Sequence, residues 1–443
     1  MQELLTQVPA TQIQTGTSLD TNLELRASTE VSSKERRTHL LNILPEDHKP
    51  YTDKYFLRTN QILEADGLDP LVRAQIFIRK GPGELFGMDE VLTMLKKYTK
   101  FFENGGKAYA KNEGDNFQGG EALLILEGKV RDFIELETMM LGALSRDSSK
   151  YNDGVSAVNP EEVRERMSMV VEAAQGRPVI YAGARHWGYE QDKAISLAAF
   201  TGGALDASTD AGAETFNKKG VGTIPHALEV IYAWKFGREN AVKEATLAFD
   251  RVIDSNVPRV ALVDFNNREI DDALATAQAF RDLGKELYAV RVDTCGENIA
   301  QGALLGEKEP KAAEWLEKYA DTSLLNESAP YAKYWYGRGV TVTGVYALRK
   351  ALDQAGFENV KIILSSGFGK AEKVKAFVQA EELLGVRLFD ALLAGEVWNG
   401  GRIATMDLVA VGESAQDLKP MSKVGRPYRP NPKLLEVDPT EIV

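Results

Sequence analysis

Short apolar runs alternate with helical patterns through the second half of the chain, and this alternation constrains the fold more than any other feature. The runs that read as buried strands are 177–183, 259–265, 286–293, 360–367 and 387–395. Helical periodicity lies between them, for example over 268–284 and 369–385. Nearly continuous apolar strands that alternate with helices predict a parallel sheet covered on both faces. An open doubly wound sheet and an α/β barrel both fit this pattern.

Polar residues gather at the ends of these strands, and their placement favours the barrel. Those at or just past a predicted strand end are Arg185, Asp264, Asp293, Ser365, Ser366 and Gly367. A barrel collects its functional groups at that end, and the loops after its last strands often hold phosphate. The last two predicted strands lead into the small-residue turns SSGFGK and LAGE. A doubly wound sheet more often carries its glycine-rich turn after the first strand, so we predict an irregular α/β, TIM-like barrel over 149–398.

The chain before the barrel is patterned differently and predicts an N-terminal α+β domain over 46–148. Its strand-like runs are 71–81 and 121–130, and its helical stretches are 88–106 and 131–146. Residues 1–45 are polar and weakly patterned. Such a segment is expected to be flexible or to pack only peripherally.

Composition excludes several classes of protein. The net charge of −12 argues against nucleic-acid binding, because a phosphate-binding face usually appears as an excess of basic residues. A single cysteine, Cys295, excludes a disulfide within the chain and a cysteine-based zinc site. The N-terminus shows no signal-peptide pattern, and no apolar run approaches the length of about 18 residues that a membrane span needs. We therefore expect a cytoplasmic protein that does not bind a membrane.

Four of the strand ends carry candidate chemistry, and each also has a purely structural interpretation. Asp264 and Asp293 follow neighbouring strands, where carboxylates bind Mg²⁺, hold sugar hydroxyls or stabilise a developing cation, but also cap helices. The turn within 365–374 offers backbone N–H groups and a helix N-terminus to an anion, or is simply a tight connection. The Arg185 guanidinium suits a phosphate or a carboxylate, or forms a structural salt bridge.

His226 is one of four histidines in the chain and lies in the stretch GTIPHALEV. Thr223 fits a helix N-cap and Pro225 fits the first turn, which places His226 near the third helical position. The positive end of a helix disfavours imidazolium, so this histidine should stay neutral and able to act as a nucleophile or as a donor to an anion. A histidine packed near the cap is the alternative, and the residues alone favour it, because one histidine fixes no chemistry.

Taken together, these segments resemble the nicotinate phosphoribosyltransferases and, more broadly, the type II phosphoribosyltransferases, which include the nicotinamide and quinolinate enzymes. The segments that carry the resemblance are TDKYFLRT (52–59), GARHW (183–187), GTIPHALE (222–229), LVDFNN, RVDTCGEN, SSGFGKAEKV and DALLAGE. They follow the family's order from about residue 50 to 430. The GTIPHALE stretch is the most specific match.

The resemblance implies a fold and a reaction. The C-terminal segment 399–443 would return to the N-terminal domain, and a homodimer or higher homo-oligomer would share its active sites. The enzyme would transfer phosphoribosyl from 5-phosphoribosyl-1-pyrophosphate to nicotinate in NAD salvage and release pyrophosphate. Mg²⁺ would assist. Coupling to ATP, which would make the protein a ligase and a phosphoprotein, stays open.

The resemblance also assigns roles to residues. The catalytic candidates are His226, Asp264 and Asp293, of which the two aspartates are also the Mg²⁺ candidates. The substrate-binding candidates are Tyr55, Arg185, Thr209, Asp210 and Arg291, with Tyr55 expected to stack on the pyridine from the partner subunit. The phosphate-binding candidates are Ser365, Ser366, Gly367, Gly369 and Gly395. His226 matches the histidine that is transiently phosphorylated in ATP-coupled members.

The sequence departs from the family at three places. Ala182 stands where a phenylalanine is expected, and Glu396 lies close to the predicted phosphate site. Asp210 matches an aspartate of the nicotinamide enzyme, where a carboxylate would repel nicotinate and accept a bond from a carboxamide. We predict nicotinate as the substrate and keep two alternatives: a nicotinamide enzyme, and a non-catalytic relative that binds a phosphoribosyl ligand.

Overall fold

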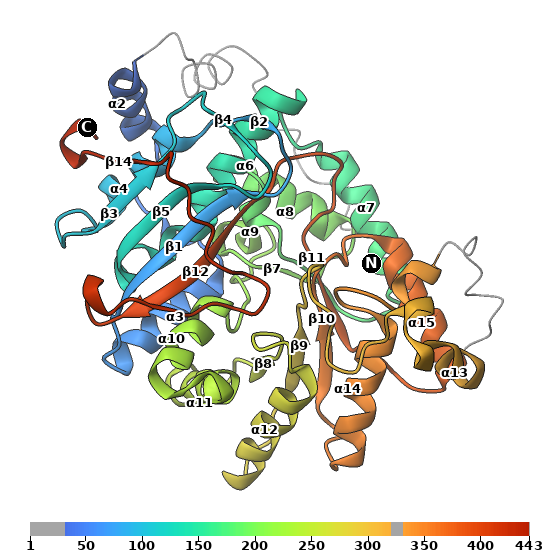
Figure 1. Cartoon of the computed structure of the whole chain (residues 1–443). Coiled ribbons are helices and arrows are strands. Elements are labelled where there is room, and N and C mark those ends of the chain that lie inside the picture. Colours follow the sequence, from blue (N-terminus) through green and yellow to red (C-terminus); the bar gives the residue numbers. More distant parts are fainter. Residues whose placement is uncertain (1–31, 320–330, 443) are drawn as a thin grey trace.

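The computed structural model describes residues 32–319 and 331–442, which form two sheets with helices packed around them (Figure 1). The greater part of the predicted N-terminal extension, residues 1–31, lies outside the described residues. None of the helices in the described part is long and apolar enough to cross a membrane.

The first sheet is antiparallel and joins strands from both ends of the chain. Its order is β13 (Lys419–Pro420), β12 (Ala404–Gly412), β1 (Leu71–Ile78), β5 (Ala122–Lys129), β3 (Lys107–Ala110) and β14 (Leu435–Glu436). A separate two-stranded antiparallel sheet pairs β2 (Gly83–Glu84) with β4 (Asn116–Phe117). The central strand β1 is hydrogen-bonded on both sides, to β12 and to β5. Residues after 403 therefore complete a sheet that begins near residue 71.

Within the described residues, five helices belong to this half of the molecule. They are α2 (Ser33–Ile43), α3 (Lys54–Ala65), α4 (Met88–Tyr98), α5 (Val130–Phe133) and α6 (Glu137–Asp153). The predicted helix over 131–146 is interrupted by a 3₁₀ turn at Ile134–Leu136 before α6 begins. Helix α4 ends at Tyr98, before the predicted Gly105, because Thr99 adopts an extended conformation and its hydroxyl donates to the Leu95 carbonyl.

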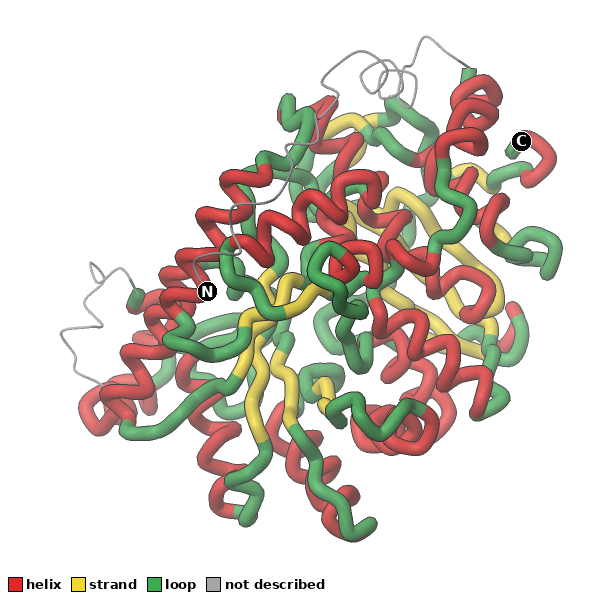
Figure 2. The backbone as a smooth tube through the Cα atoms, turned by 180° about the vertical axis from the view of Figure 1, so that it is seen from behind, coloured by secondary structure: helices red, strands yellow, loops and turns green. Residues whose placement is uncertain are grey.

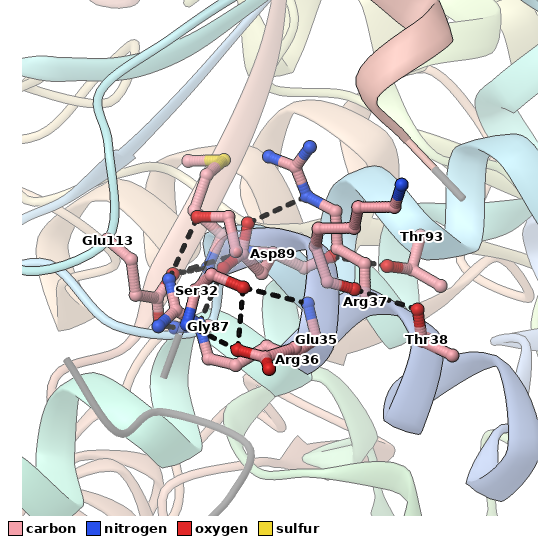
Figure 3. A network of polar contacts seen from close by, with 12 residues as sticks. Ser32, Glu35, Arg36, Arg37, Thr38, Gly87, Asp89, Thr93 and Glu113 are labelled. Carbon is pink, nitrogen blue, oxygen red and sulfur yellow. Dashed lines mark hydrogen bonds and ion pairs between the residues drawn. The ribbon is translucent and has the colours of Figure 1, made fainter. Parts of the chain in front are cut away.

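Helix α2 shows that the last part of the predicted extension is ordered against α4. Ser32 accepts the N–H of Glu35, whose carboxylate accepts the N–H of Ser32 in return, a reciprocal cap that starts the helix. Arg36 and Arg37 then donate to the two oxygens of the buried Asp89, at 2.7 and 2.8 Å (Figure 3). Because Asp89 lies in the first turn of α4, these ion pairs fasten one helix to the other.

The second sheet is parallel and follows the circular strand order of a barrel. It reads β7 (Asp206–Ala207), β6 (Val179–Tyr181), β11 (Ala391–Ala394), β10 (Lys361–Leu364), β9 (Ala289–Val292) and β8 (Val260–Leu262). The strand that comes first in the chain, β6, pairs with the one that comes last, β11. All other neighbouring strands of this sheet are consecutive in the chain. Among the described residues no strand pairing joins β7 to β8, so the predicted irregular barrel is an α/β sheet with one open seam.

Helices line the outer side of these strands, as the view from behind shows (Figure 2). The helices described in this half are α7 (Pro160–Ala173), α8 (Asp192–Thr201), α9 (Asp210–Glu214), α10 (His226–Phe236), α11 (Ala241–Val252), α12 (Glu269–Asp282), α13 (Pro310–Tyr319), α14 (Val342–Gln354) and α15 (Ala371–Leu384). Two helices join the halves of the molecule: α6 contacts both β12 and the turn Ala184–His186 after β6, and α10 also contacts β12. The carboxyl ends of the parallel strands therefore face the antiparallel sheet.

Candidate active site

A cavity of about 570 Å³ lies where the two halves meet. The predicted site residues that line it are Tyr55, Arg185, His226, Arg291, Asp293, Ser365, Ser366, Gly367 and Gly395. Asp293, Ser365 and Gly395 each directly follow a parallel strand, and such strand ends meet at one edge of a sheet. The predicted residues that do not line it are Thr209, Asp210, Asp264 and Gly369.

His226 is held by a buried ionic cluster behind the cavity wall. Its Nε2 lies 2.9 Å from Oδ1 of Asp264, which is fully buried, and the Lys423 ammonium bonds to Oδ2 of the same carboxylate. Lys423 also donates to the Asp293 carbonyl at 3.2 Å. Burial alone would raise the pKa of Asp264, but Lys423 and His226 hold that pKa well below its usual range. Asp264 is therefore ionised and belongs to the support of His226 rather than to the cavity surface.

The charge of His226 follows from this cluster. Burial, and then the nearby Lys423 ammonium, lower the pKa of His226, although Asp264 opposes them. Because an ionised carboxylate only accepts hydrogen bonds, Nε2 carries the proton and Nδ1 keeps its lone pair. The helix begins at His226 itself, with Pro225 as the N-cap, so the prediction that Thr223 caps it was wrong. Pro225 has an extended backbone, so the helix begins two residues later than a cap at Thr223 would give.

Arg185 forms the second group, at the side of the cavity made by the N-terminal half. Its Nη1 donates to the Tyr55 hydroxyl at 3.0 Å, and that hydroxyl donates to Asp53 at 3.0 Å. Glu137 lines the cavity near them, and burial raises its pKa well above the usual value, which favours the neutral acid. Tyr55 comes from the same chain as Arg185, which differs from the expectation that the partner subunit supplies it.

The turn after β10 forms the third group. Ser366 and Gly367 both have a left-handed backbone, with φ of 69° and 84°. Within the described residues the N–H groups of Ser366, Gly367 and Phe368 donate to no protein acceptor. The Ser365 hydroxyl is used in the fold, because it donates to the Val292 carbonyl at 3.2 Å. The backbone N–H groups of this turn, rather than the Ser365 hydroxyl, are thus available to an anion.

Two glycines of the predicted phosphate site lie where chain segments approach closely. A Cβ added to Gly369 would lie 2.5 Å from the Glu396 carbonyl oxygen, and one added to Gly395 would lie 2.7 Å from the His186 ring. Both glycines therefore allow the turns after β10 and β11 to pack against their neighbours. Glu396 lines the cavity but is exposed, so water screens its charge at the rim.

Thr209 and Asp210 are engaged outside the cavity. Thr209 caps α9 by accepting the Gly212 N–H at 3.1 Å and donates to Asp192 at 2.6 Å. Asp210 pairs with the Lys54 ammonium at 2.6 Å and accepts the Gly220 N–H at 2.8 Å. Neither side chain is placed to contact a ligand in the cavity, which differs from their predicted substrate-binding roles.

Arg291 lines the cavity and ties it to the loop before α10. Its Nη2 donates to the Ile224 carbonyl at 2.9 Å, while its Nε is buried and has no protein partner among the described residues. Further cations that line the cavity and were missed by the sequence analysis are Arg79, Arg338, Lys373, Lys423 and Arg426. An excess of cations in one cavity of an acidic protein indicates an anionic ligand.

The donor set was also tested against Mg²⁺. Among the described residues no group of three or more histidine, cysteine, aspartate or glutamate side chains could hold a metal ion. Asp264 does not fit as a direct ligand, because one oxygen is taken by His226 and the other by Lys423. Asp293 lines the cavity and forms no side-chain bond within the described part of the chain, so it fits as a single ligand beside substrate phosphates.

Comparison with known proteins finds similar sequences and similar solved structures. Residues 53–148 match the family model of the quinolinate phosphoribosyl transferase N-terminal domain. The nicotinate phosphoribosyltransferase pncB1 of Mycobacterium tuberculosis is 26% identical over 199 residues, which cover 45% of this chain and 40% of that protein. The matched segment thus spans less than half of the relative's length.

Solved structures share the fold over most of the chain. The nicotinate phosphoribosyltransferase of Porphyromonas gingivalis has a TM-score of 0.55 and 13% identity, covering 89% of this chain and 96% of that chain. The enzyme of Vibrio cholerae has a TM-score of 0.55 and 14% identity, covering 85% and 87%. Residues 53–148 are thus similar to the N-terminal domain of the quinolinate phosphoribosyl transferases, and most of the chain shares the fold of these two solved structures. The sequence relative and both of these structures are named as nicotinate phosphoribosyltransferases.

Proposed function

We propose that the chain is a nicotinate phosphoribosyltransferase, which makes nicotinate mononucleotide and pyrophosphate from nicotinate and 5-phosphoribosyl-1-pyrophosphate. The observation that carries the proposal is that one cavity brings together Arg185, Asp293 and the turn 365–367. They offer a cation for a substrate carboxylate, a carboxylate for a developing ribosyl cation and N–H groups for a phosphate. The names of the relatives support the same reaction.

The pyridine end of the cavity favours nicotinate over nicotinamide. Arg185 stays charged and presents a planar fork that suits a carboxylate. Asp210, whose carboxylate would favour nicotinamide as the substrate, is paired with Lys54 and does not line the cavity. The Tyr55 ring is fixed through its hydroxyl beside Arg185, where its face can pack on a pyridine.

The ribosyl transfer needs groups that stabilise positive charge on the sugar and negative charge on the leaving group. As the bond between C1 and the pyrophosphate oxygen breaks, its electron pair leaves with pyrophosphate, and the pyridine nitrogen lone pair forms the new bond. Asp293 would face the cationic sugar, and Lys423 and Arg426 would face the pyrophosphate. Mg²⁺, when bound, would neutralise charge on the pyrophosphate, with Asp293 as its protein ligand.

ATP coupling through His226 is part of the proposal. Nδ1 keeps a lone pair because Asp264 holds the Nε2 proton, and His226 is 26% exposed on the cavity wall. Attack of Nδ1 on the γ-phosphorus would form a phosphorus–nitrogen bond, break the bond to the β-phosphate oxygen and release ADP. Water would later hydrolyse the phosphohistidine and regenerate the imidazole.

Initial rates of pyrophosphate release test the substrate. Nicotinate, nicotinamide and quinolinate are compared with the phosphoribosyl donor, with and without ATP. We expect nicotinate to be the fastest by at least about tenfold, since it alone pairs one carboxylate with Arg185. A faster reaction with nicotinamide would replace the proposal by a nicotinamide enzyme. No release with any pyridine, in a protein that binds the donor, would indicate a non-catalytic relative.

Labelled ATP tests the histidine separately. The expected result is acid-labile, base-stable phosphate on the wild-type protein and none on His226→Asn. That variant should keep some ATP-independent transfer, because Asp293 and the 365–367 turn remain. A ratio of ADP formed to mononucleotide made near zero at saturating ATP would reject the phosphohistidine and leave His226 as a ligand of substrate phosphate.

A further inference from the structure

Lys373 lies in the first turn of α15 and lines the cavity beside the phosphate turn. It is only 8% exposed. Its Nζ donates to the Ser366 carbonyl at 2.9 Å and lies 4.4 Å from the centroid of the Phe368 ring. A Cβ added to Gly367 would lie 3.7 Å from Nζ. The ammonium group therefore lies directly against the turn.

This buried cation lacks a counter-charge. Among the described residues Lys373 forms no ion pair, and Glu372 beside it is taken by Lys333 and Tyr334. An unpaired buried ammonium is costly, and the positive end of a helix makes the position less favourable still. Burial, and then the neighbouring Lys370, lower the pKa of Lys373 to about 7, while Asp293 at the end of β9 opposes them. A bound anion would remove this electrostatic cost.

We propose that Lys373 is the cation that binds the phosphate monoester of the ribosyl donor, together with the unused N–H groups of the turn 366–368. The identity of the ligand as a ribosyl phosphate rests on the proposed function. The same ammonium holds the turn in shape, because it donates to the carbonyl of Ser366, a non-glycine residue with a left-handed backbone. The Lys373 side chain thus both positions the turn and binds the phosphate.

The proposal makes a prediction that a purely structural lysine does not. A dianionic phosphate next to Nζ favours the charged amine, so binding should take up a proton near neutral pH. The sign follows from the lowered pKa: the free protein loses the Lys373 charge as the pH rises through about 7, and affinity falls with it. A lysine that only shapes the turn gives no such dependence on ligand charge.

Calorimetric titration with ribose 5-phosphate, with ribose as the uncharged control, tests this. For the wild-type protein we expect the Kd to rise towards tenfold per pH unit between about pH 7 and about pH 9. Lys373→Gln retains a donor for the Ser366 carbonyl but no charge. It should weaken binding at pH 7 by at least about tenfold and flatten the pH dependence. Lys375→Gln, an exposed position in the same helix, is the matched control and should bind as the wild type does.

The outcomes separate this inference from the proposed function. If Lys373→Gln binds ribose 5-phosphate as tightly as the wild type, or if the Kd of the wild type does not change with pH, the proposed role of Lys373 is wrong. This holds even if the protein makes nicotinate mononucleotide. Absence of ribose 5-phosphate binding by the wild type would overturn it as well. Conversely, pH-dependent binding that Lys373→Gln abolishes would support the role in a protein that shows no transfer, because the titration needs neither pyridine nor turnover.

Discussion

Replacing Lys423 with methionine tests how far the C-terminal segment supports the site. The Lys423 ammonium and the Asp264 carboxylate form an ion pair in which Asp264 is fully buried and Lys423 is 7% exposed. Methionine fills most of the lysine volume but leaves Asp264 with only His226 as a partner. Removing one member of such a pair costs about 3–5 kcal/mol, because the remaining charge stays buried. We therefore expect Lys423→Met to lower the free energy of unfolding by about that amount.

The pH dependence of this loss has a definite sign. In the wild type, Asp264 has a lowered pKa, so its stabilisation is present above the unfolded pKa of about 4 and is lost only as the pH falls through the folded value. In Lys423→Met the pKa of His226 should rise, because a nearby cation has gone. Protonated His226 then partly replaces the lost charge below about pH 6.5. The loss should accordingly be larger at about pH 8 than at about pH 6.

Urea unfolding followed by tryptophan fluorescence measures the effect. Lys419→Met, at an exposed position in β13, is the matched control and should stay within about 0.5 kcal/mol of the wild type. Asp264→Asn combined with Lys423→Met removes both charges and should cost less than the sum of the single variants. A loss below about 1 kcal/mol in Lys423→Met, or strict additivity in the double variant, would refute the argument from the buried pair.

Three further predictions concern the cavity. Asp293→Asn should lower turnover by about a hundredfold or more with the fold retained, as measured by pyrophosphate release and circular dichroism, because a preorganised charge is lost; near-normal turnover would contradict its role. Mixed Tyr55→Ala and Asp293→Asn proteins should not recover activity after subunit exchange, because both side chains line one cavity of one chain; recovery would restore the shared site expected from the sequence. Gly369→Ala should destabilise the protein by about 1–3 kcal/mol in thermal unfolding, because its Cβ would meet the Glu396 carbonyl; an unchanged midpoint would show that the two turns can separate.

The sequence predicted the strands of the parallel sheet well where the apolar pattern was strong. The five apolar runs of the second half contain β6, β8, β9, β10 and β11, and each observed strand is shorter than its run. The ends of these runs were overestimated because apolar residues past a strand are buried for other reasons, as Val263 and Phe265 are after β8. The two-residue strand β7 (Asp206–Ala207) was missed, because so short a segment shows no periodicity. The open seam of the barrel lies beside that strand.

The order of the strands predicted only a part of the candidate site. Asp293, Ser365 and Gly395 were found because the carboxyl ends of parallel strands meet at one edge, whatever the detailed packing. Lys423 and Glu137 were missed because they approach the edge from the antiparallel half, and nothing in their local sequence marks that approach. Lys373 lies in a predicted helix that contains several lysines, and only the structure shows that it is buried while Lys375 is exposed.

His226 illustrates how a correct expectation can rest on an incomplete cause. The sequence attributes its neutral state to the start of a helix, and the structure gives burial and the Lys423 ammonium as the main reasons. The difference matters for chemistry. A helix end alone does not choose between the ring nitrogens, whereas Asp264 fixes the proton on Nε2 and leaves Nδ1 free to react. Since Lys423 keeps Asp264 ionised, a residue 159 positions beyond Asp264 in the chain determines which nitrogen of His226 is available.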